Sequence, residues 1–154
     1  MIEPLIAIDL GARPAIGLIT GTEQAPVLLR VRRFPRWDSR VIMGVIQEWM
    51  QEWPRAQVWC ESTFSHGTKR KPWLRDVGRK QEAQAGYISG ALGRDVERVP
   101  PCSAVEANIA WALFGWPEEG AWAKGEHVRD MLCVGLRALI RRGDRARLVA
   151  GRSE

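Results

Sequence analysis

Three short apolar segments at the start of the chain constrain its fold more than any other feature. They span 4–11 (PLIAIDLG), 14–20 (PAIGLIT) and 27–34 (VLLRVRRF), and their length and apolar content are typical of β-strands. A parallel connection needs roughly a dozen residues or more, which the short links between these segments do not provide. The sequence therefore predicts an antiparallel meander of three strands.

The rest of the chain alternates between helical and strand patterns. At 38–53, apolar residues recur at helical spacing, with Asp38 as the expected N-cap and Pro54 as the stop. The elements expected after it are, in chain order, a strand at 56–62, a helix at about 75–93, a strand at 95–100, a helix from 102 or 103 to about 114, and a helix at about 124–142. A meander followed by alternating helices and strands predicts an α/β fold, with a mixed five-stranded sheet and helices on both faces.

The length of 154 residues fits a single domain. We expect a folded domain over 1–143 and a basic C-terminal tail over 144–154. No apolar run reaches the roughly 18–20 residues that cross a bilayer, and Glu3 stands where a signal peptide would carry basic residues. These features predict a cytoplasmic protein with no membrane segment. The three cysteines are widely spaced, form no CxxC pair and are expected to be buried free thiols.

Basic residues outnumber acidic residues by 23 to 18, which gives a net charge of +5. They gather in three segments, 30–37 (RVRRFPRW), 68–75 (TKRKPWLR) and 141–147 (RRGDRAR). Basic clusters mixed with aromatic residues suit a surface that binds a phosphate backbone. A genome-wide bias toward arginine, or the charged surface of a thermophilic protein, would give the same composition. Charge alone therefore leaves nucleic-acid binding open.

Two acidic residues end apolar strands, where an unpaired carboxylate is costly to bury. Asp9 follows PLIAI, and Glu61 follows VWC. If the two strands are parallel neighbours, both carboxylates lie at the same edge of the sheet. On the last expected helix, His127 and Asp130 are three residues apart and share a face. Packed over that edge, this helix would bring three carboxylates and one imidazole together.

Carboxylates grouped in this way raise one another's pKa unless a cation neutralises them. Oxygen ligands favour Mg²⁺ or Mn²⁺ over Zn²⁺, and two such ions roughly 4 Å apart can activate a water for phosphodiester hydrolysis. Each residue also has a local explanation. Asp9 would be a turn or cap residue and Glu61 a structural one, while His127 and Asp130 would form a surface pair. Glu126 points about 100° away from His127 on an ideal helix and is expected outside the metal shell.

Taken in order, these motifs resemble a known family. IAIDLGARPAIGLIT resembles the first hairpin of the retroviral-integrase and RNase H superfamily, and most of the chain resembles RuvC-type Holliday junction resolvases. In that family an Asp ends the first strand in an I-D-x-G context, as Asp9 does, and a Glu ends the fourth strand, as Glu61 does. An H-x-x-D motif on the final helix corresponds to His127 and Asp130. The resemblance implies an RNase H-like fold in which these four residues are catalytic and bind metal.

The resemblance also implies an activity, which is a metal-dependent endonuclease that resolves four-way DNA junctions by symmetric paired cleavage in recombination and repair. The implied cofactor is Mg²⁺ or Mn²⁺, with two ions per active site, and the implied assembly is a homodimer. KQEAQAGYISGALG resembles the family's second helix, with its small residues and its role in the dimer. In the family, an aromatic residue three positions after the Glu stacks on DNA bases. Phe64 stands there, and its alternative role is to cover the core. The other expected DNA contacts are Lys69, Arg70, Lys71, Lys80 and Lys124.

The segment after the fifth strand departs from the family. Chromosomal resolvases usually carry basic residues there, whereas CSAVEANIAWALFGWPEEG is apolar and acidic, which suggests a divergent member of phage or mobile-element type. Other functions stay open. The same fold serves YqgF-type enzymes and ribonucleases H, which act on RNA or RNA–DNA hybrids. The IDLG start also occurs in actin-like and sugar-kinase ATPases, which need a longer chain and a second phosphate-binding motif. A non-catalytic nucleic-acid binding module is the last alternative.

Overall fold

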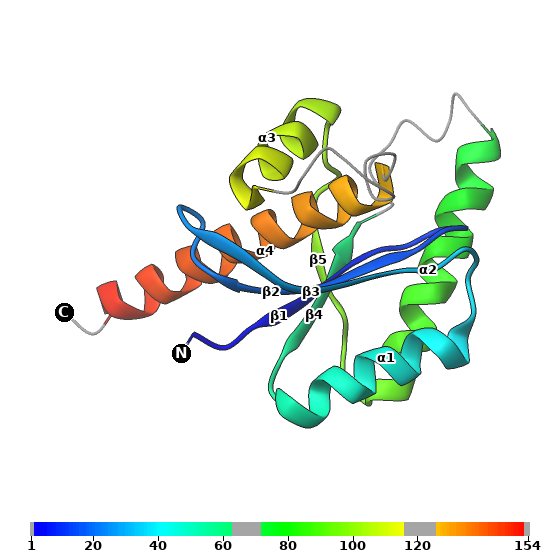
Figure 1. Ribbon diagram of the computed structural model, residues 1–154, viewed down its shortest axis with the longest axis horizontal. Coiled ribbons are helices and arrows are strands. Elements are labelled where there is room, and N and C mark those ends of the chain that lie inside the picture. The colour runs from blue at the N-terminus through cyan, green and yellow to red at the C-terminus, as the bar shows by residue number, and fades with distance from the viewer. Residues whose placement is uncertain (1, 63–71, 116–125, 153–154) are drawn as a thin grey trace.

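The computed structural model describes residues 2–62, 72–115 and 126–152 of the chain (Figure 1). Five strands form one sheet in the order β3-β2-β1-β4-β5. They are β1 (Leu5–Asp9), β2 (Ala15–Gly21), β3 (Pro26–Arg33), β4 (Gln57–Glu61) and β5 (Glu97–Val99). The first three strands pair antiparallel, and β4 and β5 extend the sheet parallel to β1. The predicted mixed sheet that begins with a meander is therefore confirmed.

Helices cover both faces of this sheet, as Figure 1 shows. Those described are α1 (Ser39–Glu52), α2 (Pro72–Leu92), α3 (Ala104–Phe114) and α4 (Glu126–Arg152). Side chains alternate along β1, so Leu5 and Ala7 join the core under α3 and α4, whereas Ile6 and Ile8 join the core over α1 and α2. Because both faces are covered, β1 is buried along its length up to Asp9. The strand that carries the site is therefore held from both sides.

Local signals set the bounds of α1 as the sequence predicts. The side chain of Asp38 accepts a hydrogen bond from the backbone N–H of Val41 at 3.3 Å, which caps the first turn. Apolar residues at helical spacing, among them Ile42, Ile46 and Trp49, are buried against the sheet. The helix ends at Glu52, shortly before Pro54.

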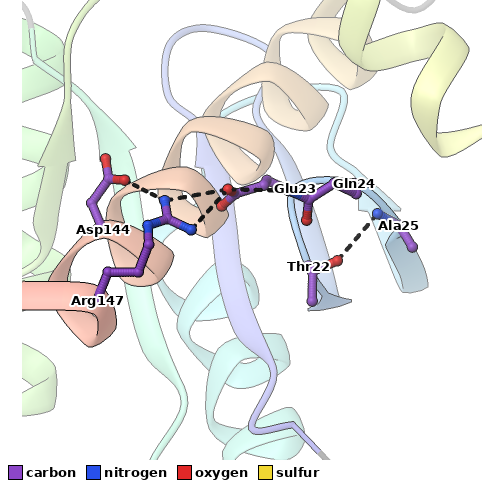
Figure 2. A network of polar contacts seen from close by, with 6 residues as sticks. All are labelled: Thr22, Glu23, Gln24, Ala25, Asp144 and Arg147. Atoms are coloured by element: carbon purple, nitrogen blue, oxygen red, sulfur yellow. Dashed lines mark hydrogen bonds and ion pairs between the residues drawn. The ribbon is translucent and has the colours of Figure 1, made fainter. Parts of the chain in front are cut away.

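Helix α4 is longer than the sequence predicts. The sequence predicts an end at about 142, before a basic tail, but the helix continues through Gly143 to Arg152. Gly143 faces the hairpin here, because a Cβ at this position would lie 2.7 Å from Oε2 of Glu23, the flexible end of a side chain in the β2–β3 turn. Arg147 pairs with Glu23 at 3.3 Å and also with Asp144 (Figure 2). These contacts tie the C-terminal part of α4 to the β2–β3 hairpin.

The middle of α4 also packs closely on the sheet. A Cβ on Gly135 would overlap the side chain of Ile19 on β2, so only glycine permits this approach. On either side of Gly135, residues such as Met131, Leu132 and Leu139 are buried in the core. The position of α4 relative to β1 and β2 is therefore set by packing along several turns, which also places its N-terminal turn.

The structure bears on two further expectations from the composition. All three cysteines are free, and Cys60 and Cys133 are buried as expected, whereas Cys102 is half-buried. Within the described ranges, no helix combines the length and the apolar character needed to cross a bilayer.

Candidate active site

Asp9 and Glu61 lie at the same edge of the sheet, as the sequence predicts. Strands β1 and β4 are parallel neighbours, and the last residues that pair between them are Ile8 and Cys60. Asp9 and Glu61 follow these residues directly and end their strands. Each is intermediate in burial rather than exposed. Two carboxylates from distant parts of the sequence are thus held side by side on a rigid frame.

The first turn of α4 lies over this edge and brings His127 to Asp9. Nδ1 of His127 lies 2.8 Å from Oδ2 of Asp9, although the two residues are 118 positions apart. The next residue, Val128, is fully buried and fixes this turn of the helix. The imidazole keeps 40% of its side-chain surface exposed and the Asp9 side chain keeps 15%. His127 therefore stands between a buried carboxyl and solvent.

Asp9 is the electrostatic centre of this group. Burial has the largest effect and raises the pKa of its carboxyl from 3.8 to about 7. The hydrogen bond with His127 lowers this pKa, whereas the negative charges of Asp130 and Glu61 raise it further. Both acids are therefore near enough to interact with Asp9. The structure brings all four residues of the predicted site into one electrostatic unit.

The donor set of this group suits a hard divalent cation. Three carboxylates and one imidazole are ligands that Mg²⁺ and Mn²⁺ accept, and the buried Asp9 carboxylate needs a positive partner to be stable in its ionised form. The side chains do not form a complete cage by themselves. Among the described residues, no three His, Cys, Asp or Glu side chains are grouped closely enough to enclose an ion. A bound Mg²⁺ would keep several water ligands, as it usually does in proteins.

The turn that follows Asp9 is held by α2, which the sequence did not reveal. Gln84 accepts a hydrogen bond from the N–H of Gly11 at 2.9 Å and donates one to its carbonyl oxygen at 3.1 Å. Gln81 donates to the carbonyl oxygen of Leu10 at 3.3 Å. The two glutamines are one helical turn apart, and that spacing was the only available signal. Their partners lie 71 and 73 positions away, so only the fold pairs them.

Most of the expected DNA contacts lie outside the described residues. Lys80 is described, and it is exposed on α2, where it lines a cavity of about 530 Å³ together with Gly11, Ala12 and Trp37. This cavity adjoins the turn after Asp9, so Lys80 lies on the side of the molecule that carries the candidate site. The residues outside the described ranges are Phe64, Lys69, Arg70, Lys71 and Lys124. The position of the Glu126 side chain is likewise not described.

Comparison with known proteins identifies the fold. No protein-family model matches the sequence, and no curated protein matches it. The structure is similar to that of T. thermophilus RuvC in complex with a Holliday junction substrate, with a TM-score of 0.66 and 16% sequence identity over 92% of this chain and 96% of that chain. It also resembles the Fowlpox virus resolvase in complex with Holliday junction DNA, with a TM-score of 0.48 and 13% identity over 90% of this chain and 97% of that chain. The first likeness shows that the chain has the fold of RuvC, and it confirms the RNase H-like fold predicted from the sequence.

Proposed function

We propose that this protein is a divalent-metal-dependent endonuclease that resolves four-way DNA junctions. The observation that carries the proposal is the meeting of Asp9, Glu61 and the first turn of α4 at one edge of a sheet with the fold of RuvC. The T. thermophilus protein of that fold is described with a Holliday junction as its substrate. Recombination and repair of DNA in the cytoplasm would be the setting of such an activity.

Each residue of the site has a role that follows from its position. When bound, Mg²⁺ or Mn²⁺ would supply an activated water and stabilise the leaving oxygen of the phosphodiester. Asp9 is central and buried, so it would be shared between two ions, and Glu61 and Asp130 would each complete one coordination shell. Nδ1 of His127 orients the Asp9 carboxyl. In this geometry, a contact of the imidazole with a cation or with the attacking water would use Nε2.

Symmetric paired cleavage requires two copies of this site, and α2 offers a surface for a homodimer. Gly86 and Gly90 are exposed on α2 and are four residues apart, and a Cβ built on either meets no atom within 4 Å. Tyr87 lies beside them with 46% of its surface exposed. A surface of small residues permits a second α2 helix to approach closely. We therefore place the dimer contact on this part of α2.

Substrate competition tests the proposed activity. Ca²⁺ in place of Mg²⁺ should allow binding without cleavage, so that a labelled four-way junction can be competed with duplex DNA or with an RNA–DNA hybrid in a gel-shift assay. We expect the junction to bind most tightly, and we expect Mg²⁺ or Mn²⁺ to produce paired nicks in strands of like polarity. Preference for the hybrid would instead indicate a nuclease of the same fold that acts on RNA. Junction binding with no cleavage under any metal would indicate a binding module.

A further inference from the structure

Four arginines lie beside the candidate site, and we refer to them as the arginine edge: Arg13, Arg32, Arg33 and Arg36. The register of the sheet places them. Asp9 pairs with Ala15 on β2, and Ala15 pairs with Arg33 on β3. Neighbouring strands are about 4.8 Å apart, so the backbone of Arg33 lies two strand spacings, or roughly 10 Å, from that of Asp9. Residues in such a row share a face of the sheet, so Arg33 lies on the face of Asp9, whereas Arg32, in register with Ile16 and Ile8, lies on the opposite face at the same end.

The backbone continues this pairing beyond the end of β3. The N–H of Phe34 donates to the carbonyl oxygen of Pro14 at 2.9 Å. Arg13 comes directly before Pro14, and Arg36 comes two residues after Phe34. Both therefore extend the row of positive charge at the end of the sheet that carries Asp9. Strand β3 runs in the same direction as β1, so this row and the candidate site occupy the same end.

Three charges of the arginine edge are not neutralised by the described part of the fold. Arg13, Arg32 and Arg36 are exposed, and no carboxylate in the described ranges forms an ion pair with any of them. The guanidinium of Arg32 lies 5.9 Å from the centre of the Phe34 ring. Arg30, which lies farther along β3, differs, because it pairs with Glu52 at 2.5 Å. Positive charge is thus left available toward the site end of this strand.

The cavity beside Lys80 connects this charge to α2. Trp37 follows Arg36 directly, and it lines the cavity of about 530 Å³ together with Lys80. An aromatic wall next to cationic side chains is typical of surfaces that contact nucleic acids. The cavity joins the arginine edge to the one described lysine that the sequence singles out as a DNA contact. Lys80 and the arginine edge are therefore both near the turn that follows Asp9.

We propose that the arginine edge is a phosphate-binding track for one duplex arm of the junction, which leads away from the active site across β3. The inference rests on the proposed function, because it assumes that branched DNA occupies the edge with Asp9. Exposed guanidinium groups in a row offer bidentate hydrogen bonds to backbone phosphates without reading the base sequence. The track holds the arm in a fixed direction while its phosphodiester lies at the site.

A pair of matched triple variants tests the track. One variant carries Arg13→Gln, Arg32→Gln and Arg36→Gln. The control carries Arg55→Gln, Arg145→Gln and Arg147→Gln. Arg145 and Arg147 lie on the C-terminal part of α4, and Arg55 lines a cavity together with Arg145. Arg145 is about 27 Å along the helix from His127. Both variants remove three positive charges from a net charge of +5. Affinity for a four-way junction is measured with Ca²⁺ between about 50 and 200 mM salt, and thermal unfolding confirms that each variant is folded.

The track predicts different results for the two variants. The edge variant should bind the junction about tenfold or more weakly, and the slope of its log affinity against log salt should be shallower by about 2–3, because each arginine that no longer neutralises a phosphate reduces the slope by about one unit. The control should stay within about threefold of wild type. An equal decrease in junction affinity in both variants would show that only the net charge of the protein matters, and this would overturn the track. Unchanged junction affinity of the edge variant would also overturn it. A wild-type protein that binds no junction would refute the proposed function itself, so the two failures are distinguishable.

Discussion

The two ends of the sheet are both rich in arginine, but their arginines have different surroundings. At the end with the β2–β3 turn, the arginines of α4 contact acceptors from other elements: Arg142 the carbonyl oxygens of Glu3 and Gly21, Arg145 the carboxylate of Glu97, and Arg147 that of Glu23 (Figure 2). At the end with Asp9, no described carboxylate pairs with Arg13, Arg32 or Arg36. Arginine side chains thus connect elements of the fold at one end of the sheet and remain exposed at the other.

This difference indicates that contacts at one end of the sheet stabilise the fold, whereas residues at the other end are available to bind a ligand. At the far end, opposite charges compensate each other and attach α4 to the hairpin. At the site end, the Asp9 carboxyl is buried among other acids, and arginine side chains remain exposed. The burial of this carboxyl lowers the stability of the fold unless a cation is bound. Substitutions at the site end should therefore change ligand binding and leave the fold as stable as before or more stable. At the far end, a substitution that leaves a half-buried acceptor without its donor should lower stability and leave ligand binding unchanged, whereas loss of an exposed ion pair should change little.

The largest expected effect on stability comes from Asp9→Asn in metal-free buffer. A raised pKa in the folded state means that the stability contributed by this carboxyl is present below about pH 4 and is lost as the pH rises to about 7. The asparagine variant avoids that loss. Its advantage over wild type should grow through this range and reach at most about 4 kcal/mol, since each pKa unit corresponds to about 1.4 kcal/mol. Urea unfolding in EDTA at several pH values measures the difference.

The exposed residue Asp95 supplies the control for this measurement. Asp95→Asn removes one negative charge without removing a buried carboxyl, so it should leave stability nearly unchanged. The difference in free energy of unfolding between Asp9→Asn and wild type could instead be the same at pH 4 and at pH 8. The pKa of Asp9 would then not be raised, and the contrast between the two ends of the sheet would be wrong.

Divalent cations should stabilise the wild-type protein by a somewhat smaller amount. A ligand that binds only the folded state at a hundredfold excess over its Kd adds about 2.7 kcal/mol. Thermal unfolding with Mg²⁺ or Mn²⁺ should therefore show a higher Tm for wild type and little change for Glu61→Gln. An equal increase in both proteins would place the ion elsewhere.

A comparison of two arginines tests the contrast directly. Arg142 is half-buried and donates to the Glu3 carbonyl oxygen at 2.5 Å and to that of Gly21 at 3.4 Å. Arg142→Ala leaves those oxygens without this donor and should lower the free energy of unfolding by about 1–2 kcal/mol. The exposed Arg36→Ala should stay within about 0.5 kcal/mol of wild type. Chemical denaturation measures the free energy of unfolding of both variants. An equal decrease in the two would contradict the proposed difference between the ends of the sheet.

The smallest effect is expected at the ion pairs in Figure 2. Glu23→Gln removes the carboxylate that pairs with Arg147, whose side chain is 62% exposed. The Glu23 side chain is 20% exposed, but its partner is largely in water, which screens the pair. The Tm should therefore fall by no more than about 2 °C, and junction cleavage should be unchanged. A large decrease in Tm would show that this contact, rather than the buried packing of Gly135 and its neighbours, holds α4 on the sheet.

Local patterns in the sequence were sufficient for the order of elements and for the edge with the two acids. Strand length and short connections determine the meander, and apolar runs that end in Asp9 and Glu61 place both carboxylates at the carboxyl ends of strands. His127 was associated with them on the assumption that the last helix packs over that edge, and the resemblance to a family supported this assumption, because nothing local indicates a contact across 118 positions. The roles of these residues in metal binding and catalysis stay predictions.

The features that were missed depend on contacts between distant segments. Gly143 resembles a helix stop when it is considered alone, but the helix continues through it, with the Glu23 side chain of the β2–β3 turn beside it. The arginines at 30–37 and at 141–147 are equivalent as sequence. Only the fold distinguishes them, because it gives Arg142 carbonyl acceptors and Arg147 a carboxylate, whereas no described carboxylate pairs with Arg32 or Arg36. Likewise, Gln84 becomes the support of the turn after Asp9 only when α2 lies beside β1.

We propose Asp9 as the core of a metal-dependent nuclease site on this sheet edge. Asp9→Asn tested on a four-way junction addresses it directly, with cleavage measured in Mg²⁺ and binding measured in Ca²⁺. Cleavage should fall by about 10³-fold or more, since loss of a shared metal ligand removes several kcal/mol of transition-state stabilisation, while junction affinity stays within about threefold of wild type. Cleavage at the wild-type rate by the folded variant would contradict the account.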